Sequence, residues 1–241
     1  MPKVAIDGNN VLLVVPARGG SKSIPHKNLK KVGGYSLVAR AAMVAASLDW
    51  VDSAIVSTED NEIAEEAKRY HLDVPFLRPL ELAGDSSTSV DMWKHAWLAS
   101  EAEYNMTFDI SVLLEPTSPL RTSQDVTNTV RLLLDGEYQA AATVSKTPAH
   151  FTPEKTLTIN TDGAINLYIN DGSDYSLRQK IPSYYHRNGI CYASRRESLI
   201  KRGNIIENHC AALIIDRPVV NIDEPYELEL ANWLESRPIV S

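Results

Sequence analysis

Basic residues and glycines are concentrated in one short stretch near the N-terminus. Residues 16–22 read Pro-Ala-Arg-Gly-Gly-Ser-Lys, and the polar stretch continues to Lys27 and Asn28. Glycines let backbone N–H groups approach an anion closely, while arginine and lysine side chains neutralise phosphates. The pattern indicates a binding site for a small polyanion; the alternative is a basic turn that is purely structural.

The distribution of charge bears on the same stretch. The formal net charge of the chain is −7, yet residues 1–40 carry seven basic residues against one acid. A local positive field on an acidic body suits a small polyanion. It argues against a general nucleic-acid binder, which needs a broad positive surface. A solvated basic face is the alternative interpretation.

Common motifs of other nucleotide and metal sites do not occur in the sequence. There is neither a Walker pattern, Gly-x-x-x-x-Gly-Lys-Ser/Thr, nor a Gly-x-Gly-x-x-Gly. The histidines and cysteines show no zinc-site spacing. No apolar run approaches the roughly 20 residues of a membrane span, and no secretory signal pattern opens the chain. We therefore expect a cytoplasmic protein with reduced thiols and no membrane or nucleic-acid partner.

The elements that must position the basic turn alternate between strands and helices. Val11–Val15 is an apolar run typical of a strand buried on both faces, and the turn follows it directly. Tyr35–Leu48 then has helical spacing, which completes the first half of a βαβ unit. Repetition of this rhythm predicts an α/β fold, a mostly parallel sheet with helices on both faces and ligands at the carboxyl ends of its strands. Further strands are predicted at Ala54–Ser57, Asp73–Leu77, Ile110–Leu114 and Ala140–Ser145, and helices at Asn61–Tyr70 (capped through Thr58), Thr88–Tyr104 and Ser123–Leu134.

The rhythm breaks between residues 146 and 186. Prolines and polar turns there separate two short β-like runs, Lys155–Ile159 and Ala164–Ile169. We expect a small β insertion within a single domain of residues 1–241, too polar to form its own core and suited to packing on a neighbouring subunit. The α/β pattern then resumes, with strands at Gly189–Ala193 and Ala212–Ile215 and helices from Arg196 and Tyr226.

Five sequence blocks, in order between residues 16 and 223, resemble the acylneuraminate cytidylyltransferases, also called CMP-sialic acid synthetases. The basic turn through Asn28 is similar to the family's nucleotide-binding signature. Leu77–Asp85 resembles its Arg-Pro…Leu-Ala-x-Asp segment, and Leu114–Arg121 its Leu-x-Pro-Thr-Ser-Pro-Leu-Arg motif. The remaining blocks are Arg178-Gln179…Pro182…Asn188-Gly189…Tyr192 and Asn221-Ile222-Asp223.

The resemblance implies a Rossmann-like nucleotidyltransferase that joins CTP to a nine-carbon sugar acid of the sialic acid type and releases pyrophosphate. It implies a homodimer in which the insertion helps to close the partner's sugar site. Three cations, Arg18, Lys22 and Lys27, would stabilise the charge that builds on the phosphoryl oxygens and the leaving group. The implied nucleotide contacts are Ala17, Arg18, Gly19, Ser21, Lys22, Lys27, Asn28, Arg78, Asp85, Ser86 and Ser87.

The resemblance also assigns the sugar and the metal. The implied sugar contacts are Glu115, Thr117, Lys155, Arg178, Gln179 and Asn188. Lys155 can equally be a solvated loop residue, and Arg121 is expected to be structural, tying the Pro-Thr-Ser-Pro turn together. Mg²⁺, which prefers hard oxygen ligands, would bind at Asp223 with Asn221 beside it. The alternative role for Asp223 is to cap the final helix.

Three positions depart from the family pattern. Asn221 replaces an acid, Glu115 replaces a common glutamine, and His186 stands where a basic residue is frequent. A carboxylate in this pocket repels an acidic sugar unless it is paired with a cation or directed at a hydroxyl or amine. The departures favour a variant sugar such as a legionaminic or pseudaminic acid. Two alternatives stay open: a cytidylyltransferase for another sugar acid such as the eight-carbon Kdo, and a catalytically impaired dimeric scaffold.

Overall fold

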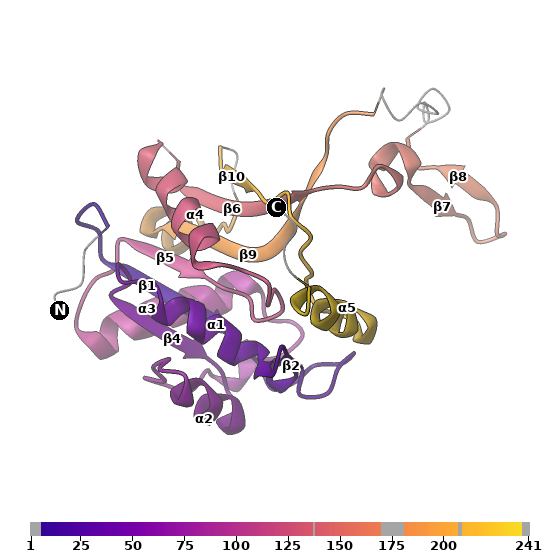
Figure 1. Ribbon diagram of the computed structural model, residues 1–241. Coiled ribbons are helices and arrows are strands. Elements are labelled where there is room, and N and C mark those ends of the chain that lie inside the picture. Colours follow the sequence, from indigo (N-terminus) through magenta and orange to yellow (C-terminus); the bar gives the residue numbers. More distant parts are fainter. Residues whose placement is uncertain (1–5, 137, 170–180, 207–208, 238–241) are drawn as a thin grey trace.

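The protein is built around a six-stranded sheet with helices on both faces (Figure 1). The computed structural model describes residues 6–136, 138–169, 181–206 and 209–237. In the order β10-β6-β9-β5-β1-β4, three neighbouring pairs are parallel, and β9 runs antiparallel to both of its neighbours. The predicted mostly parallel sheet is confirmed. The strands are β1 (Val11–Pro16), β4 (Ser53–Ser57), β5 (Ile110–Leu113), β6 (Ala140–Lys146), β9 (Tyr185–Arg195) and β10 (Ala211–Ile214).

Strand β1 is buried on both faces, as its apolar run predicts. Val11, Leu13 and Val15 pack into a core shared with α1 (Leu37–Ala46), α2 (Asn61–Arg69) and α4 (Ser123–Asp135). Leu12 and Val14 point to the opposite face, where they meet Trp93 and Trp97 of α3 (Ser89–Tyr104). Since alternate side chains of a strand face opposite ways, a run of five apolar residues fits only a strand covered on both sides.

Two predicted details are wrong, and a third is confirmed in a different helical form. At 73–77 only Asp73 bridges to Ile55, because Pro75 has no N–H for a ladder. Helix α2 is capped by Asp60, whose Oδ1 accepts from Glu62 N at 2.8 Å and Ile63 N at 3.1 Å, and Thr58 instead accepts from Asp60 N at 3.1 Å. The predicted helix from Arg196 is present, with Arg196 as its N-cap, and Glu197–Arg202 forms a π-helix.

The insertion leaves the sheet between β6 and β9 and projects away from the body of the molecule (Figure 1). Two short 3-10 turns, η3 (Ala149–Phe151) and η4 (Pro153–Lys155), lead to a separate antiparallel hairpin. Its strands are β7 (Leu157–Ile159) and β8 (Ile165–Leu167), and all six residues are exposed. The two predicted β runs are therefore confirmed in shortened form.

The C-terminal helix α5 (Pro225–Glu235) packs against the far end of the basic loop. Ala231 and Ile222 share a small core with Ile24, Val32 and Leu37. The loop itself contains the turn η1 (Lys27–Leu29) and the short pair β2 (Lys31–Val32) and β3 (Tyr35–Ser36). This packing brings the segment before α5 beside Lys27. Within the described part of the chain, no helix has the length and apolar character needed to span a bilayer.

Candidate active site

The carboxyl ends of β1 and β5 open onto one cavity of about 420 Å³. The segment before α5 closes one side of it. A larger hollow of about 910 Å³ beside α2 is lined by none of the predicted site residues, and its lining includes the α2 carboxylates Glu62, Glu65 and Glu66. The cavity at the strand ends gathers the cations instead; the predicted residues that line it are Arg18, Lys27, Asn28, Arg78, Asp85, Ser87, Glu115, Thr117, Asn221 and Asp223.

The turn after β1 is shaped by contacts with the start of α2. Gly19 N–H donates to Glu59 Oε1 at 2.7 Å, and a Cβ at Gly19 would overlap the Asp60 carboxylate. Only glycine allows this approach. Asn28 is buried and donates from Nδ2 to the Arg18 carbonyl at 2.9 Å. The predicted nucleotide residues Gly19 and Asn28 thus hold the turn in shape.

Glu59 was not predicted from the sequence. It lies two residues after β4 ends at Ser57, and β4 pairs with β1, so the two strand ends lie side by side. Ala17 N donates to Ser57 O at 3.0 Å at the same edge. Adjacency of strand ends is the signal that could have identified Glu59, but it requires the pairing of β1 with β4 to be known.

Two cations of the turn are bound to one carboxylate. Asp85 Oδ1 lies 3.2 Å from Arg18 Nη1, and its Oδ2 lies 2.8 Å from Lys22 Nζ. Lys22 first, and Arg18 second, lower the pKa of the Asp85 carboxyl, so it is ionised at neutral pH. Ser87 lies in the cavity wall, whereas Ser21 and the exposed Ser86 do not. The structure therefore brings Arg18, Lys22 and Asp85 together.

Arg78 holds the segment after β4 against the end of that strand. The side chain is buried, donates from Nε to Ser57 Oγ at 3.1 Å, and also donates to the Ser57 carbonyl. Burial lowers the pKa of the guanidinium, an effect that the nearby Glu59 carboxylate opposes. Arg78 contributes a fixed positive charge to the cavity wall.

Lys27 and Asp223 join the basic loop to the segment before α5. Lys27 Nζ donates to Asp223 Oδ1 at 2.9 Å and to the Ile222 carbonyl at 3.0 Å. The Lys27 side chain is 16% exposed, and that of Asp223 is 70% exposed. Glu224, not Asp223, caps α5 in a capping box with Glu227, so the capping alternative for Asp223 is wrong.

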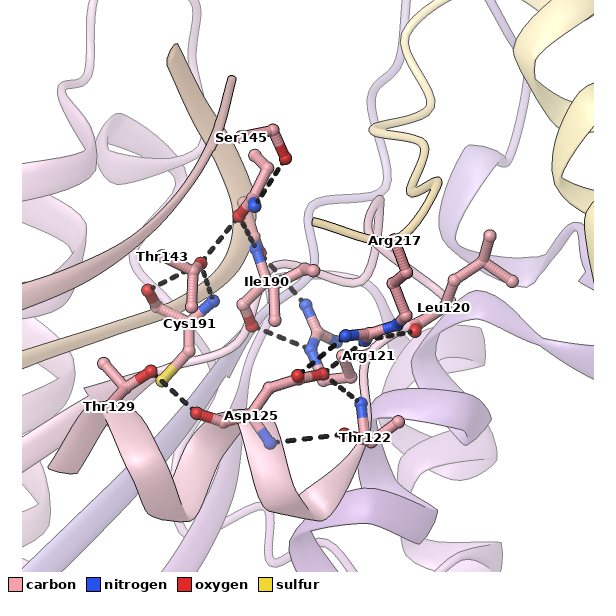
Figure 2. Close-up of polar contacts among 12 residues, drawn as sticks. Leu120, Arg121, Thr122, Asp125, Thr129, Thr143, Ser145, Ile190, Cys191 and Arg217 are labelled. Atoms are coloured by element: carbon pink, nitrogen blue, oxygen red, sulfur yellow. Dashed lines mark hydrogen bonds and ion pairs between the residues drawn. The ribbon is translucent and has the colours of Figure 1, made fainter. Parts of the chain in front are cut away.

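The loop after β5 is fixed by Arg121, as predicted. Arg121 is buried and donates to the carbonyls of Ile190 at 2.9 Å, Gly189 at 3.1 Å and Glu115. Burial lowers its pKa to about 10. Figure 2 shows Arg121 next to Arg217, which binds Asp125 at the start of α4 through two nitrogens, at 2.9 and 2.5 Å. These contacts clamp the loop against β9.

Asn188 was predicted to bind the sugar, but its side chain is occupied within the sheet. Its Oδ1 accepts from Thr143 Oγ1 at 2.6 Å and from Ile190 N at 3.2 Å. Its Nδ2 donates to Ser145 Oγ at 3.0 Å. Asn188 therefore joins β6 to β9 at the register shift between these strands and positions the following Gly189.

Glu115 lies in the cavity wall with an uncommitted carboxylate. A Cβ at Gly189, whose φ is +70°, would overlap Glu115 Oε2, so glycine is required for this approach. Burial raises the pKa of Glu115, while Arg121 and Arg187 act in the opposite direction. No side chain in the described ranges donates a hydrogen bond to the carboxylate oxygens of Glu115. These oxygens are open to a ligand.

The sequence matches the family model described as "Cytidylyltransferase" over residues 12–235. The chain belongs to the cytidylyltransferase family. It is 25% identical to "Post-translational flagellin modification protein B" of Campylobacter coli, over 94% of this chain and 95% of that protein. It is 26% identical to "CMP-N,N'-diacetyllegionaminic acid synthase" of Legionella pneumophila, over 93% of this chain and 95% of that protein.

A solved structure supports the Rossmann-like nucleotidyltransferase fold of this cytidylyltransferase. The fold is similar to that of a CMP:2-keto-3-deoxy-manno-octonic acid synthetase complexed with CTP, with a TM-score of 0.68. The match covers 93% of this chain and 98% of that chain at 18% identity. At this identity the likeness concerns the fold alone.

The remaining predicted sugar contacts of the cytidylyltransferase differ in where they lie. Lys155 is exposed in η4 of the insertion and does not line the cavity. Arg178 and Gln179 lie outside the described residues. Thr117 does line the cavity, and its carbonyl accepts from Ile222 N at 2.8 Å. Among the predicted sugar contacts in the described ranges, Glu115 and Thr117 line the cavity, whereas Lys155 and Asn188 do not.

The donor set at Asp223 fits a magnesium ion that is shared with a substrate. Among the residues that the structure describes, no group of three or more His, Cys, Asp or Glu side chains is placed to hold a metal. Mg²⁺, however, usually takes one or two carboxylates together with waters and substrate phosphates. Asp223 is exposed beside the cations, and Asn221 lines the same cavity with its Oδ1 3.5 Å from Ser118 Oγ.

Proposed function

We propose that this cytidylyltransferase transfers CMP from CTP to the anomeric hydroxyl of a nine-carbon 2-keto sugar acid and releases pyrophosphate. The observation that carries the proposal is the single cavity in which Arg18, Lys27 and Arg78 face Glu115 and Asp223. It offers cations for a triphosphate on one side and an open carboxylate on the other. The Legionella relative bears the name of a CMP-sugar-acid synthase, which supports the same reaction class here.

The reaction depends on the protein stabilising negative charge more than on covalent catalysis by a side chain. The anomeric hydroxyl loses its proton to water, its oxygen forms a bond to the α-phosphorus, and the bond from that phosphorus to the oxygen of the β-phosphate breaks. Negative charge grows on the phosphoryl oxygens and on the departing pyrophosphate. Lys27, with most of its side chain out of water, stabilises this charge more strongly than a solvated lysine does. Arg18 and Lys22 extend the positive surface toward the leaving group.

Magnesium belongs to this proposal as the cofactor. Asp223 would hold it, with the Asn221 amide oxygen beside it, and the ion would neutralise charge on the nucleotide phosphates. Asp223 also fixes Lys27 through their 2.9 Å ion pair. The ion pair therefore fixes Lys27 relative to the segment before α5, which carries the proposed metal ligand.

The sugar half of the site points to a variant nine-carbon acid. The Glu115 carboxylate can accept a hydrogen bond from an amine, amide or hydroxyl of the sugar, but it repels a second carboxylate. This requirement suits a legionaminic or pseudaminic type of sugar, whose carboxylate would have to lie away from Glu115. The predicted partners for that carboxylate are Arg178, Gln179 and Lys155.

A homodimer would explain why the hairpin of β7 and β8 exposes an apolar face. Leu157 pairs with Leu167 and Ile159 with Ile165, so all four apolar side chains share one face. They are 41–73% exposed, and an isolated two-stranded hairpin is only marginally stable in water. A second copy of the chain would cover this face and bring η4 with Lys155 to the partner's cavity. The cytoplasmic location predicted from the sequence is part of the same proposal.

Pyrophosphate release tests the reaction. The protein is assayed with CTP, Mg²⁺ and a panel of sialic, legionaminic and pseudaminic acids together with Kdo. Turnover with at least one nine-carbon acid and little with Kdo is the expected result. Preference for Kdo would favour the eight-carbon alternative, and CTP binding without turnover on any acid would favour the impaired scaffold.

A further inference from the structure

Asp85 occupies the cations that are proposed to bind phosphate. Its two oxygens bind two different side chains, Oδ1 to Arg18 at 3.2 Å and Oδ2 to Lys22 at 2.8 Å. A phosphate group also carries separate anionic oxygens, and these can bind an arginine and a lysine at the same time. The second bond of Arg18 goes to the Ala83 carbonyl at 3.4 Å, so the segment that carries Asp85 lies over the turn.

The contact can be displaced. The side chains of Arg18, Lys22 and Asp85 are 42%, 80% and 59% exposed, and exposed ion pairs are weak. The same segment contributes Gly84, Asp85 and Ser87 to the cavity wall. The Ser87 hydroxyl is buried with no hydrogen-bond partner among the described residues. A ligand could therefore satisfy a hydrogen-bonding group in this wall.

We propose that Asp85 is an internal competitor for the anionic end of the nucleotide, and that it lowers the affinity of the free protein for pyrophosphate. This inference rests on the proposed function, because it takes Arg18 and Lys22 to be phosphate ligands. Any anion that uses these cations must first displace Asp85. When pyrophosphate leaves, Asp85 binds Arg18 and Lys22 again, which weakens retention of the product.

Binding of pyrophosphate in EDTA, measured by calorimetry without CTP or sugar, tests the inference. Loss of two exposed ion pairs predicts that Asp85→Asn binds pyrophosphate about three- to tenfold more tightly than the wild type. Glu81→Gln is the matched control, because it removes the same charge from the same exposed segment without a described contact to Arg18 or Lys22. Its pyrophosphate affinity should stay within about twofold of the wild type. Cytidine, which has no phosphate, is the ligand control and should bind both variants like the wild type.

A double-mutant cycle with Lys22→Gln isolates the contact. Without Lys22, the Asp85→Asn substitution should tighten pyrophosphate binding less than it does in the wild-type background. Unchanged or weaker pyrophosphate binding by Asp85→Asn would overturn the inference, as would equal tightening by Glu81→Gln. Altered cytidine binding would also overturn it, since Asp85 would then be a base contact. If the wild type binds neither pyrophosphate nor CTP, the proposed function itself fails.

Discussion

The two halves of the cavity differ in how completely one chain builds them. In the proposed nucleotide half, Arg18, Lys27, Arg78 and Asp85 line the cavity and Lys22 binds Asp85, so its cations are already bound to carboxylates, carbonyls or a hydroxyl. In the sugar half, Glu115 has no hydrogen-bonding side-chain partner within the described chain, and Lys155 lies far out on the insertion. The residues of the nucleotide half are positioned by the ends of strands in one sheet of one chain. The second half needs a ligand and, in our proposal, a second subunit.

The largest effect is expected in the nucleotide half. Lys27→Ala removes a largely desolvated cation at the phosphates and should lower kcat by about 10²- to 10³-fold with every sugar acid. Lys30→Ala, which removes an exposed lysine from the same loop, is the control and should be close to the wild type. Pyrophosphate release gives both values. A loss confined to one sugar would show that Lys27 belongs to the sugar half.

The hairpin tests whether the sugar half needs a partner. Ile159→Lys combined with Ile165→Lys places charges on the apolar face of β7 and β8 and should convert a dimer into monomers in sedimentation experiments. Because the sugar would lose positioning groups, turnover should fall by about 10²-fold while CTP affinity is retained. Thr158→Lys, on the opposite face of the hairpin, is the control. Monomers with full turnover would contradict the proposed role of the insertion.

The basic turn of the proposed nucleotide half is a local pattern that the sequence can show, whereas contacts between distant segments are not. Val11–Val15 and the following turn are contiguous, and a buried strand with a basic turn at its end is a local pattern. Asp85 binds Lys22 only because segments far apart in the chain meet at the sheet edge, and no local pattern reports this. Asn188 looks like a ligand in its motif, yet its amide is held by Thr143 of another strand.

Strand β9 shows the same limit in the fold. The apolar run Gly189–Ala193 predicted a strand, but the observed one extends from Tyr185 to Arg195, with exposed residues at its start. Its antiparallel direction depends on the path of the insertion before it, which composition does not fix. Helix ends are more local: Thr88 caps α3 within the predicted boundaries, whereas Asp60 displaces Thr58 at α2 because it lies nearer the first helical turn.

Glu115→Gln should weaken binding of the sugar acid and leave binding of CTP unchanged, with a smaller effect than the two substitutions above. The variant keeps the shape of the side chain and one acceptor but loses the charge. A charge-assisted hydrogen bond from the sugar would be weakened, so KM for the preferred acid should rise by about tenfold. The affinity for CTP, measured by calorimetry, is the internal control and should not change. Equal losses for CTP and sugar would place Glu115 in the nucleotide half.

The smallest effect concerns stability and pH. Burial raises the pKa of Glu115 above its ordinary value of 4.5, so the folded protein binds this proton more tightly than the unfolded chain does. The protonated carboxyl therefore favours folding below that value, and this contribution is lost as the pH rises through the raised pKa. Glu115→Gln carries no such proton. The Tm of the variant minus that of the wild type should grow from pH 4.5 to pH 8 in thermal scans. A difference that stays constant across this range would mean that the carboxylate is as well solvated or paired as it is in the unfolded chain, which would leave the sugar half as complete as the nucleotide half.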